Sequence, residues 1–319
     1  MSALKFLWSI GMLSFDLVTV GHFSIDFIRT KRDLISKPSL GGPPTFVSLA
    51  AKRLKAKVSV ISNVGEDFPE DYVRWLMNED IDLSMLRRIK GASTTSYELI
   101  YDEMGRRQLI LKSRAPPITP SLIPESLSAK VAHISPIAGE VSYEVIDKLR
   151  ENASLLSLDP QGLLRRFNEE GRVSLGKLED QRVLRIIDIF KASEEEIKIA
   201  MGNLKVDDAI GILCKMGVDI VIVTRGGRGV TLSFNGRIYE VPAAKPRIVV
   251  DTTGAGDVFI GAFLAEYIRG KEPLWCSCVG SASASFVIEE PGPRGLRSSS
   301  EIYERAECIY EKVSTRKSA

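Results

Sequence analysis

The sequence predicts an α/β protein with a mostly parallel central sheet covered by helices on both faces. Short β-branched runs alternate with amphipathic segments from residue 131 onward, as in successive βαβ units. Two pairs of strand-like runs flank glycine-containing turns, which predicts smaller antiparallel parts. A chain of 319 residues with 44% apolar residues is long enough to bury a substantial core.

The predicted strands of the parallel sheet are short and apolar. The first, residues 17–20, ends at Gly21, as expected for a central strand. Crossovers between such strands are expected to be right-handed. The remaining strands are predicted at residues 57–62, 131–135, 155–158, 183–189, 219–224 and 248–250.

The helices and one hairpin are marked by their terminal residues. Gly41-Gly42-Pro43-Pro44 predicts a turn into a helix, because proline is tolerated in a first helical turn. Asn235-Gly236 predicts a type I′ turn between two strands, residues 230–234 and 237–241. Ser298 and Glu301 have the spacing of a capping box. Helices are predicted at residues 45–54, 71–77, 258–268, 274–286 and 300–313.

Two further segments predict a small antiparallel lid, residues 26–40 and 94–115. The first contains a hairpin around Lys31-Arg32-Asp33, and the second a hairpin around Asp102-Glu103-Met104-Gly105. A lid over a ligand site would exclude water from a reactive group.

Residues 1–15 are interpreted as an N-terminal leader, and residues 16–319 as one domain. The apolar run at 6–13 could be taken for a signal segment, but no clear cleavage site follows it, and Met12 is a candidate for the native start. No run is long enough to span a bilayer. The four cysteines lack metal-ligand spacing and are expected to be reduced, although a disulfide among them stays open.

Charge points to a small-molecule ligand. Lys and Arg number 43 and Asp and Glu 41, a net charge of +2 that gives no field suited to nucleic acid. The two histidines, His22 and His133, are interpreted as hydrogen-bonded structural residues near strand ends.

The turn at residues 251–257 is the predicted phosphate site. Gly254 and Gly256 let a ligand approach the main chain, and the N-terminus of the following helix offers amide hydrogens and partial positive charge. Asp257 stands at the start of that helix, where it could act as a base beside the anion.

This turn, Asp251-Thr252-Thr253-Gly254-Ala255-Gly256-Asp257 followed by Phe259, Gly261 and Phe263, resembles the signature of the PfkB, or ribokinase-like, sugar kinases. The resemblance implies a three-layer α/β/α ribokinase-like fold with a small antiparallel β lid. It also implies a cytoplasmic enzyme that transfers the γ-phosphoryl group of ATP, bound with Mg²⁺. Asp257 inherits the role of catalytic base, and Gly254, Ala255 and Gly256 inherit the anion hole.

Two segments resemble the nucleotide-binding parts of that family. Ser193 and Glu196 form a capping box by spacing, and they also occupy the place of the family's Asn-x-x-Glu motif, which implies that Glu196 orders Mg²⁺ through water. The turn containing Thr224, Gly226 and Gly229 resembles the family's nucleotide turn.

The acceptor segments resemble the myo-inositol kinase branch most closely. Asp26 and the Gly41-Gly42 turn match the family's acceptor positions, and a carboxylate suits a polyol because it accepts hydrogen bonds from two hydroxyls. Phe46 stands where many sugar kinases have Asn. The residues implied at the acceptor are Asp26, Gly41, Gly42, Phe46, Asp159, Gln161 and Arg165.

Several alternatives remain open at this point. The acceptor could be a nucleoside or another sugar, such as ribose, fructose or 2-keto-3-deoxygluconate, and Arg165 could be a solvated helix residue. A non-catalytic sugar-binding regulator is the alternative of another class, although such a protein would be expected to have lost the base. Lid strands that pair between subunits would give a homodimer.

Overall fold

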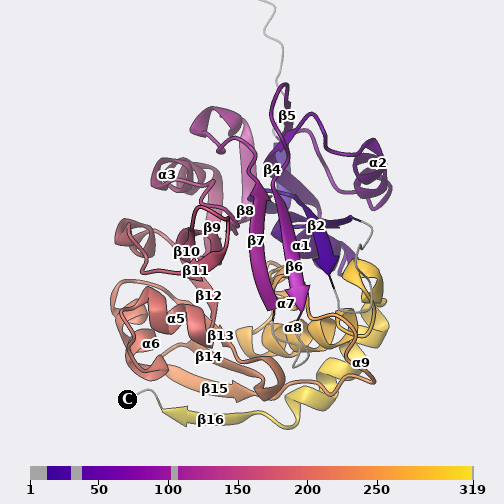
Figure 1. Ribbon diagram of the computed structural model, residues 1–319. Helices are drawn as coiled ribbons and strands as arrows, with labels where there is room; N and C mark the ends of the chain where they lie inside the picture. The colour runs from indigo at the N-terminus through magenta and orange to yellow at the C-terminus, as the bar shows by residue number, and fades with distance from the viewer. Residues whose placement is uncertain (1–12, 30–37, 102–106, 318–319) are drawn as a thin grey trace, which may run out of the picture.

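The chain folds around one ten-stranded sheet with helices on both faces (Figure 1). The computed structural model describes residues 13–29, 38–101 and 107–317. The strand order is β16-β15-β14-β13-β12-β9-β8-β1-β4-β5. The strands that pair in parallel are β1 (Leu13–Val20), β4 (Val58–Gly65), β5 (Leu86–Ile89), β8 (Leu127–Ile134), β9 (Ala153–Leu158), β12 (Ile189–Ser193) and β13 (Ile220–Thr224).

One edge of the sheet is antiparallel. It consists of β14 (Val230–Phe234), β15 (Arg237–Val241) and β16 (Ser314–Lys317). Asn235 and Gly236 both have positive φ, as the predicted type I′ turn requires. The sequence did not predict β16, which closes this edge with the C-terminal segment.

Alternating residues of each strand pack on the two opposite helical layers. Val18 of β1 packs on the side covered by α3 (Tyr143–Asn152), α5 (Glu194–Ala200) and α6 (Val206–Lys215), whereas Leu17 packs on the other side. That other layer contains α1 (Pro43–Arg53), α7 (Ala255–Tyr267), α8 (Pro273–Val287) and α9 (Ser299–Tyr310). Helix α2 (Glu70–Asn78) packs beside α1 in a smaller cluster.

Helix α7 lies at the centre of its layer. Every residue from Val258 to Glu266 is buried, because α1 packs on one side of this helix and α8 on the other. A helix that is apolar on all sides has no solvent face, so its start is held firmly in place. The predicted phosphate turn is thereby fixed to a rigid element.

The lid is a separate four-stranded sheet in the order β3-β2-β6-β7. β2 (Ser24–Arg29) pairs antiparallel with β3 (Ser39–Gly41), and β6 (Ser96–Tyr101) pairs antiparallel with β7 (Arg107–Ser113). The central pair, β2 and β6, is parallel. The turns predicted around Lys31-Arg32-Asp33 and Asp102-Glu103-Met104-Gly105 lie outside the described residues.

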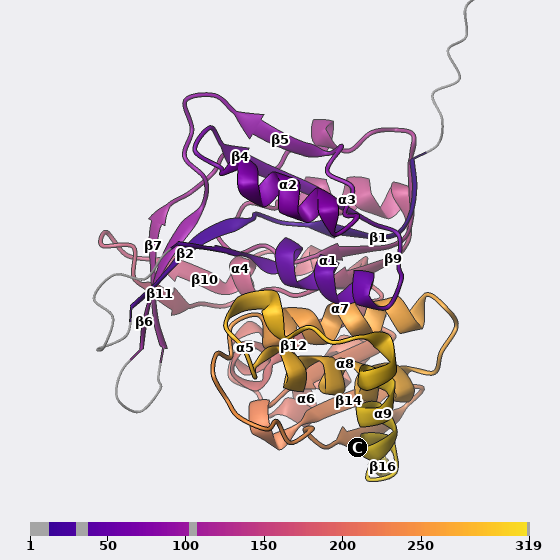
Figure 2. The same ribbon diagram turned by 90° about the vertical axis from the view of Figure 1, so that its right-hand side faces the viewer.

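A two-stranded sheet of β10 (Arg165–Phe167) and β11 (Val173–Leu175), which the sequence did not predict, follows the short helix α4 (Gln161–Leu164). It reaches the lid, because the amide of Leu111 in β7 donates to the carbonyl of Gly171 at 2.8 Å. Figure 2 shows the lid and this two-stranded sheet at the same end of the molecule.

Two of the predicted strands were wrong. Residues 183–189 begin as a 3₁₀ helix, Gln181–Arg185, because the Asp180 side chain caps the Arg182 amide, and β12 starts only at Ile189. Residues 248–250 form no strand. Instead, the amide of Val250 donates to the carbonyl of Ile288 at the end of α8.

One boundary also differs from the prediction, whereas Asp26 lies in β2, within the predicted lid. β1 begins at Leu13, so residues 13–15 belong to the sheet and not to the predicted leader. None of the helices in the described part of the chain has the length and apolar character needed to cross a membrane.

Candidate active site

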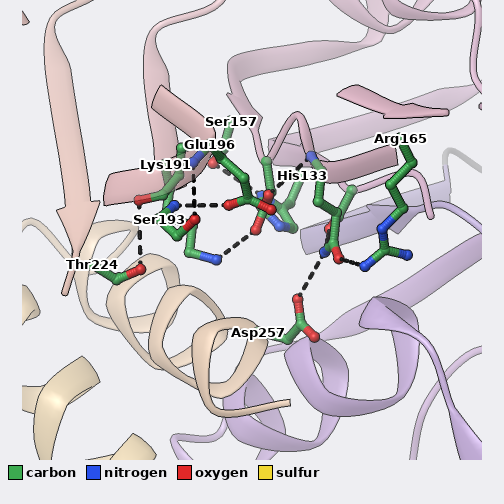
Figure 3. A network of polar contacts seen from close by, with 12 residues as sticks. His133, Ser157, Arg165, Lys191, Ser193, Glu196, Thr224 and Asp257 are labelled. Atoms are coloured by element: carbon green, nitrogen blue, oxygen red, sulfur yellow. Dashed lines mark hydrogen bonds and ion pairs between the residues drawn. The ribbon is translucent and has the colours of Figure 1, made fainter. Parts of the chain in front are cut away.

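The candidate site lies at the carboxyl ends of the parallel strands, where open α/β sheets bind their ligands. The lid, the 251–257 turn and the residues that follow β9 and β12 converge there (Figures 2 and 3). Gly254 is the N-cap of α7 and has a left-handed backbone, with φ 75° and ψ 0°. A Cβ on Gly254 would lie 2.4 Å from the Phe46 ring. Both the left-handed backbone and this close approach therefore require glycine at position 254.

The N-terminus of α7 offers main-chain donors to an anion. The amides of Gly256 and Asp257 occupy the second and third helical positions, which have no partner within a helix. The amide of Ala255 donates to the Thr252 carbonyl at 3.3 Å, so this member of the predicted anion hole is already engaged. Asp251 accepts from the Thr253 amide at 2.9 Å and thereby tightens the turn.

Asp257 lies partly exposed at the bottom of the site. Burial raises the pKa of the Asp257 carboxyl to about 7, the Lys191 ammonium opposes this rise, and the Asp159 carboxylate adds to it. A carboxylate with a pKa near neutrality is suited to accept a proton from an alcohol as the alcohol attacks. The predicted base therefore stands in an environment that tunes it for this task.

Gln161 of α4 contacts Asp257, and Arg165 of β10 lies on the same side of the site (Figure 3). Gln161 Nε2 lies 3.5 Å from Asp257 Oδ1 and 3.3 Å from Ser135 Oγ. Gln161 Oε1 accepts from Arg165 Nη2 at 2.8 Å, and Arg165 Nη1 donates to the Ile137 carbonyl at 3.0 Å. Arg165 is therefore held in the site, which departs from the alternative of a solvated helix residue.

A buried glutamate that the sequence analysis missed supports this arrangement. Glu140 accepts from the amides of His22, Ile137 and Ala138 at 2.7–3.0 Å. It thereby fixes the loop that carries the carbonyl bound by Arg165. No motif marked Glu140, because its partner His22 lies 118 residues away and its local partners are main-chain amides, which leave no pattern of side chains.

Asp159 does not line the acceptor cavity, although the resemblance placed it at the acceptor. It is buried, and its Oδ2 accepts a 2.5 Å hydrogen bond from Nζ of Lys191, in the middle of β12. The sequence analysis missed Lys191. A lysine in an apolar strand next to a capping box was the one available signal.

The acceptor cavity is small and has both polar and apolar lining residues. Its volume is about 90 Å³, which leaves room for only a few water molecules. Its polar lining comes from Asp26, Gln161, Arg165 and Asp257. Apolar and aromatic side chains lie between and beside these groups: Phe46, Tyr97, Leu99, Leu109 and Ile137.

Of the glycines predicted at the acceptor, Gly42 lines this cavity. Gly41 lies beside it, and a Cβ there would come within 2.0 Å of Asp26 Oδ2. Gly41 therefore makes room for the Asp26 carboxylate. Asp26 Oδ1 accepts from Ser24 Oγ at 2.7 Å.

A second cavity, of about 410 Å³, lies on the other side of the 251–257 turn. The predicted nucleotide residues Thr224, Gly226 and Gly229 line it. Most of the remaining lining is small or apolar and comes from the 243–249 segment, α7 and α8: Ala243, Ala244, Pro246, Val249, Ala255, Phe259, Ala284 and Ile288. The exposed Val249 side chain thus faces a cavity, which explains an apolar segment outside the sheet.

Ser193 and Glu196 lie next to this cavity without lining it. Their capping box is present: Ser193 Oγ accepts from the Glu196 amide at 3.2 Å, and the Ser193 amide donates to Glu196 Oε2 at 2.8 Å. Among the described residues no group of three or more His, Cys, Asp or Glu side chains could hold a metal ion by itself. A divalent cation at Glu196 would thus need phosphate or water oxygens as its other ligands.

Both histidines have structural contacts. His22 Nδ1 lies 2.8 Å from Thr95 Oγ1, and His133 Nδ1 lies 3.0 Å from Ser157 Oγ. Burial lowers the pKa of His133 to about 3, so this residue stays neutral beside the site. All four cysteines are unpaired in the structure.

The fold and this site define a phosphotransferase that acts on a hydroxyl group: an anion-binding helix N-terminus carries a tuned carboxylate between two cavities. The chain belongs to the pfkB family of carbohydrate kinases, whose family model matches residues 14–299. The resemblance predicted from the 251–257 turn is confirmed, and so is the ribokinase-like fold.

Individual relatives differ in the acceptors that their names state. The cytidine kinase of Thermococcus kodakarensis is 32% identical over 282 residues, which are 87% of this chain and 97% of that protein. The nucleoside kinase structure of Methanocaldococcus jannaschii is 25% identical, with a TM-score of 0.74 over 92% of this chain and 98% of that one. A pyrophosphate-dependent kinase of the ribokinase family, complexed with a pyrophosphate analog and myo-inositol, is also 25% identical, with a TM-score of 0.75 over 92% of this chain and 100% of that one.

Proposed function

We propose that this enzyme transfers the γ-phosphoryl group of ATP to a ribose hydroxyl of a nucleoside. The mixed polar and apolar lining of the acceptor cavity carries this proposal, and a nucleoside would have to widen the cavity as it binds. A ribose presents hydroxyls to Asp26 and Asp257, and its base needs the kind of apolar wall that Tyr97, Leu99 and Ile137 provide. The similarity to a cytidine kinase over nearly the full length of both chains supports the same acceptor class.

The second candidate is myo-inositol, the acceptor favoured by the sequence analysis. Its support is the set of polar residues that line the cavity and the likeness to a structure containing myo-inositol. Inositol carries a hydroxyl on every ring carbon, so it gains little from burial against Leu99 and Leu109. For this reason we rank it below a nucleoside.

Asp257 is assigned as the base. Its carboxylate takes the proton of the acceptor hydroxyl as the acceptor oxygen bonds to the γ-phosphorus, and the bond from that phosphorus to the β–γ bridging oxygen breaks to release ADP. Gln161 holds the Asp257 carboxylate through its side-chain amide. The amides of Gly256 and Asp257 bind the phosphoryl oxygens, and we assign Ala255 a lesser part because its amide is engaged.

The donor is assigned as ATP and not pyrophosphate because of the 410 Å³ cavity. Pyrophosphate would leave its small and apolar lining without a ligand, whereas a purine base would cover Val249 and Ile288. Thr224, Gly226 and Gly229 would contact the phosphates or ribose. When bound, Mg²⁺ neutralises charge on the phosphates. Glu196, whose carboxylate accepts from the Ser193 amide in the capping box, would hold this ion through water.

We further propose a cytoplasmic enzyme that dimerises through the lid. By strand register, Ile25, Phe27 and Ile110 share the lid face opposite Tyr97 and Leu99. Phe27 is 39% exposed there, which gives this face an apolar centre for a second copy.

An ADP-release assay with Mg-ATP across cytidine, adenosine, myo-inositol, ribose, fructose and 2-keto-3-deoxygluconate tests the acceptor. We expect the highest kcat/KM with a nucleoside. A larger value for myo-inositol would overturn the acceptor class and keep the kinase assignment. Pyrophosphate in place of ATP tests the donor, and we expect no turnover with it.

A further inference from the structure

Lys191 is a buried lysine whose hydrogen-bonding capacity is only partly used. Its side chain is 6% exposed, and its one hydrogen-bond partner among the described residues is Asp159 Oδ2 at 2.5 Å. An ammonium carries three N–H donors, and a buried donor without a partner is costly. Two donors of Lys191 are therefore available for a second anion.

The ammonium lies against the backbone that forms the anion site. A Cβ on Gly256 would come within 2.8 Å of Lys191 Nζ, so the absence of a side chain at Gly256 lets the cation reach α7. Lys191 comes from β12, on the far side of Asp257 from Arg165 (Figure 3). The first turn of α7 thus has a positive charge from a side chain in addition to its own amides.

The charges around Lys191 keep it protonated. Burial lowers the pKa of Lys191, but the carboxylates of Asp159, Asp257 and Glu196 outweigh this and hold the pKa above its ordinary value. Three carboxylates in this cluster face two cations, Lys191 and Arg165. Lys191 is thus expected to act as a fixed charge and not as a proton carrier.

We propose that Lys191 is a phosphoryl-binding residue, which donates hydrogen bonds to the transferring group beside the Gly256 amide while Asp159 holds it in place. This proposal rests on the placement of the phosphoryl group at the 254–257 turn. Lys191 makes and breaks no covalent bond, and its proton stays in place. Its part is to neutralise negative charge on the phosphoryl oxygens, as an added donor of the anion hole. Asp159 is then a positioning residue and not an acceptor-binding one.

The test removes both charges of the Lys191–Asp159 pair, so that neither is left buried without its partner. Lys191→Met alone would strand the Asp159 carboxylate and could unfold the protein, so the main variant is Lys191→Met with Asp159→Asn. The Asp159→Asn substitution keeps a side-chain oxygen for the main-chain N–H of Gln161, which donates to Asp159 Oδ1 at 3.3 Å. Lys198→Met is the matched control, because Lys198 pairs with Glu194 in α5, away from the turn. Thermal melts establish that each variant is folded.

The readout separates phosphoryl binding from a structural role. We expect the double variant to bind ADP within about twofold of the wild type, to bind a non-hydrolysable ATP analogue at least ~10-fold more weakly, and to lose ~10²-fold or more in kcat. Lys198→Met should leave all three quantities unchanged.

A folded double variant with analogue affinity and kcat within threefold of the wild type would show that the pair is structural and would overturn the proposal. The binding arm is independent of the acceptor. If the wild type phosphorylated none of the acceptors, the proposed function would fail. A loss of affinity for the ATP analogue in the double variant would still support the assignment of Lys191 as a phosphoryl-binding residue.

Discussion

Gln161 Nε2 lies 3.5 Å from Asp257 Oδ1, and Gln161 Oε1 accepts from Arg165, so three residues from α4, β10 and α7 form one chain of polar contacts across the site. These contacts place the carboxylate at the border between the acceptor and donor cavities. A base at such a border can take a proton from one ligand as the other ligand is attacked.

Asp257→Asn should reduce kcat by ~10² or more, because the amide cannot accept the proton of the acceptor hydroxyl. Nucleotide affinity should change little, since the shape of the turn is kept. Steady-state ADP release and calorimetric titration with ADP measure the two quantities. Turnover near that of the wild type would exclude Asp257 as the base.

The pH dependence of kcat/KM should follow the same carboxylate. Burial raises the pKa of Asp257 to about 7, and the base works only when it is deprotonated. Activity should thus fall about tenfold per pH unit below this pKa and level off above it. A profile that stays flat from pH 5 to pH 8 would contradict the assignment. The Asp257→Asn variant should have lost this limb.

Stability should move in the opposite direction to activity. The pKa of Asp257 is higher in the folded state than its ordinary value of 3.8, so the folded protein binds this proton more tightly than the unfolded chain. Stability is therefore lost as pH rises between about 4 and 7, and the loss is complete above the folded pKa. Asp257→Asn removes the charge, so we expect its Tm to exceed that of the wild type at pH 8 and to exceed it less at pH 4.5. A Tm of Asp257→Asn below that of the wild type at pH 8 would contradict this prediction, because it would show that the folded protein stabilises the Asp257 carboxylate.

Gly254→Ala should destabilise the enzyme through two separable effects. Position 254 has φ 75°, which costs an L-residue roughly 1 kcal/mol, and the new methyl group would meet the Phe46 ring. Adding Phe46→Ala relieves the collision and not the backbone strain. Denaturant unfolding of the four proteins in this double-mutant cycle should give a favourable coupling between the two substitutions. Simple additivity would place the Phe46 ring away from the turn.

The parts of the fold and site that could be predicted from sequence are those with local causes. The 251–257 turn, the capping box at Ser193 and the Asn235-Gly236 hairpin depend on residues within a few positions of one another. The strand predicted at 248–250 was wrong because the Val250 amide donates to the carbonyl of Ile288, 38 residues further along the chain. Lys191 was missed for the same reason, since its partner Asp159 is 32 residues away and no local pattern joins them.

Gly171 connects the two-stranded sheet to the lid, and its substitution should separate acceptor binding from nucleotide binding. The Leu111 amide donates to the Gly171 carbonyl at 2.8 Å, and a Cβ on Gly171, whose φ is 78°, would lie 2.1 Å from the Leu111 carbonyl oxygen. Gly171→Ala should therefore push β7 away from the sheet whose first strand carries Arg165. Leu109 and Leu111 of β7 pack in the same cluster as Tyr97, so the acceptor cavity should loosen. Steady-state kinetics should show a higher KM for the acceptor and an unchanged KM for ATP.

Gly202→Ala is the matched control for this variant, because Gly202 has φ 79° and nothing within 4 Å of an added Cβ. It imposes the same backbone strain and touches no part of the lid. If both variants raised the acceptor KM equally, the effect would come from lost stability and not from the lid. A rise confined to Gly171→Ala would show that the β10–β11 sheet holds the lid over the acceptor.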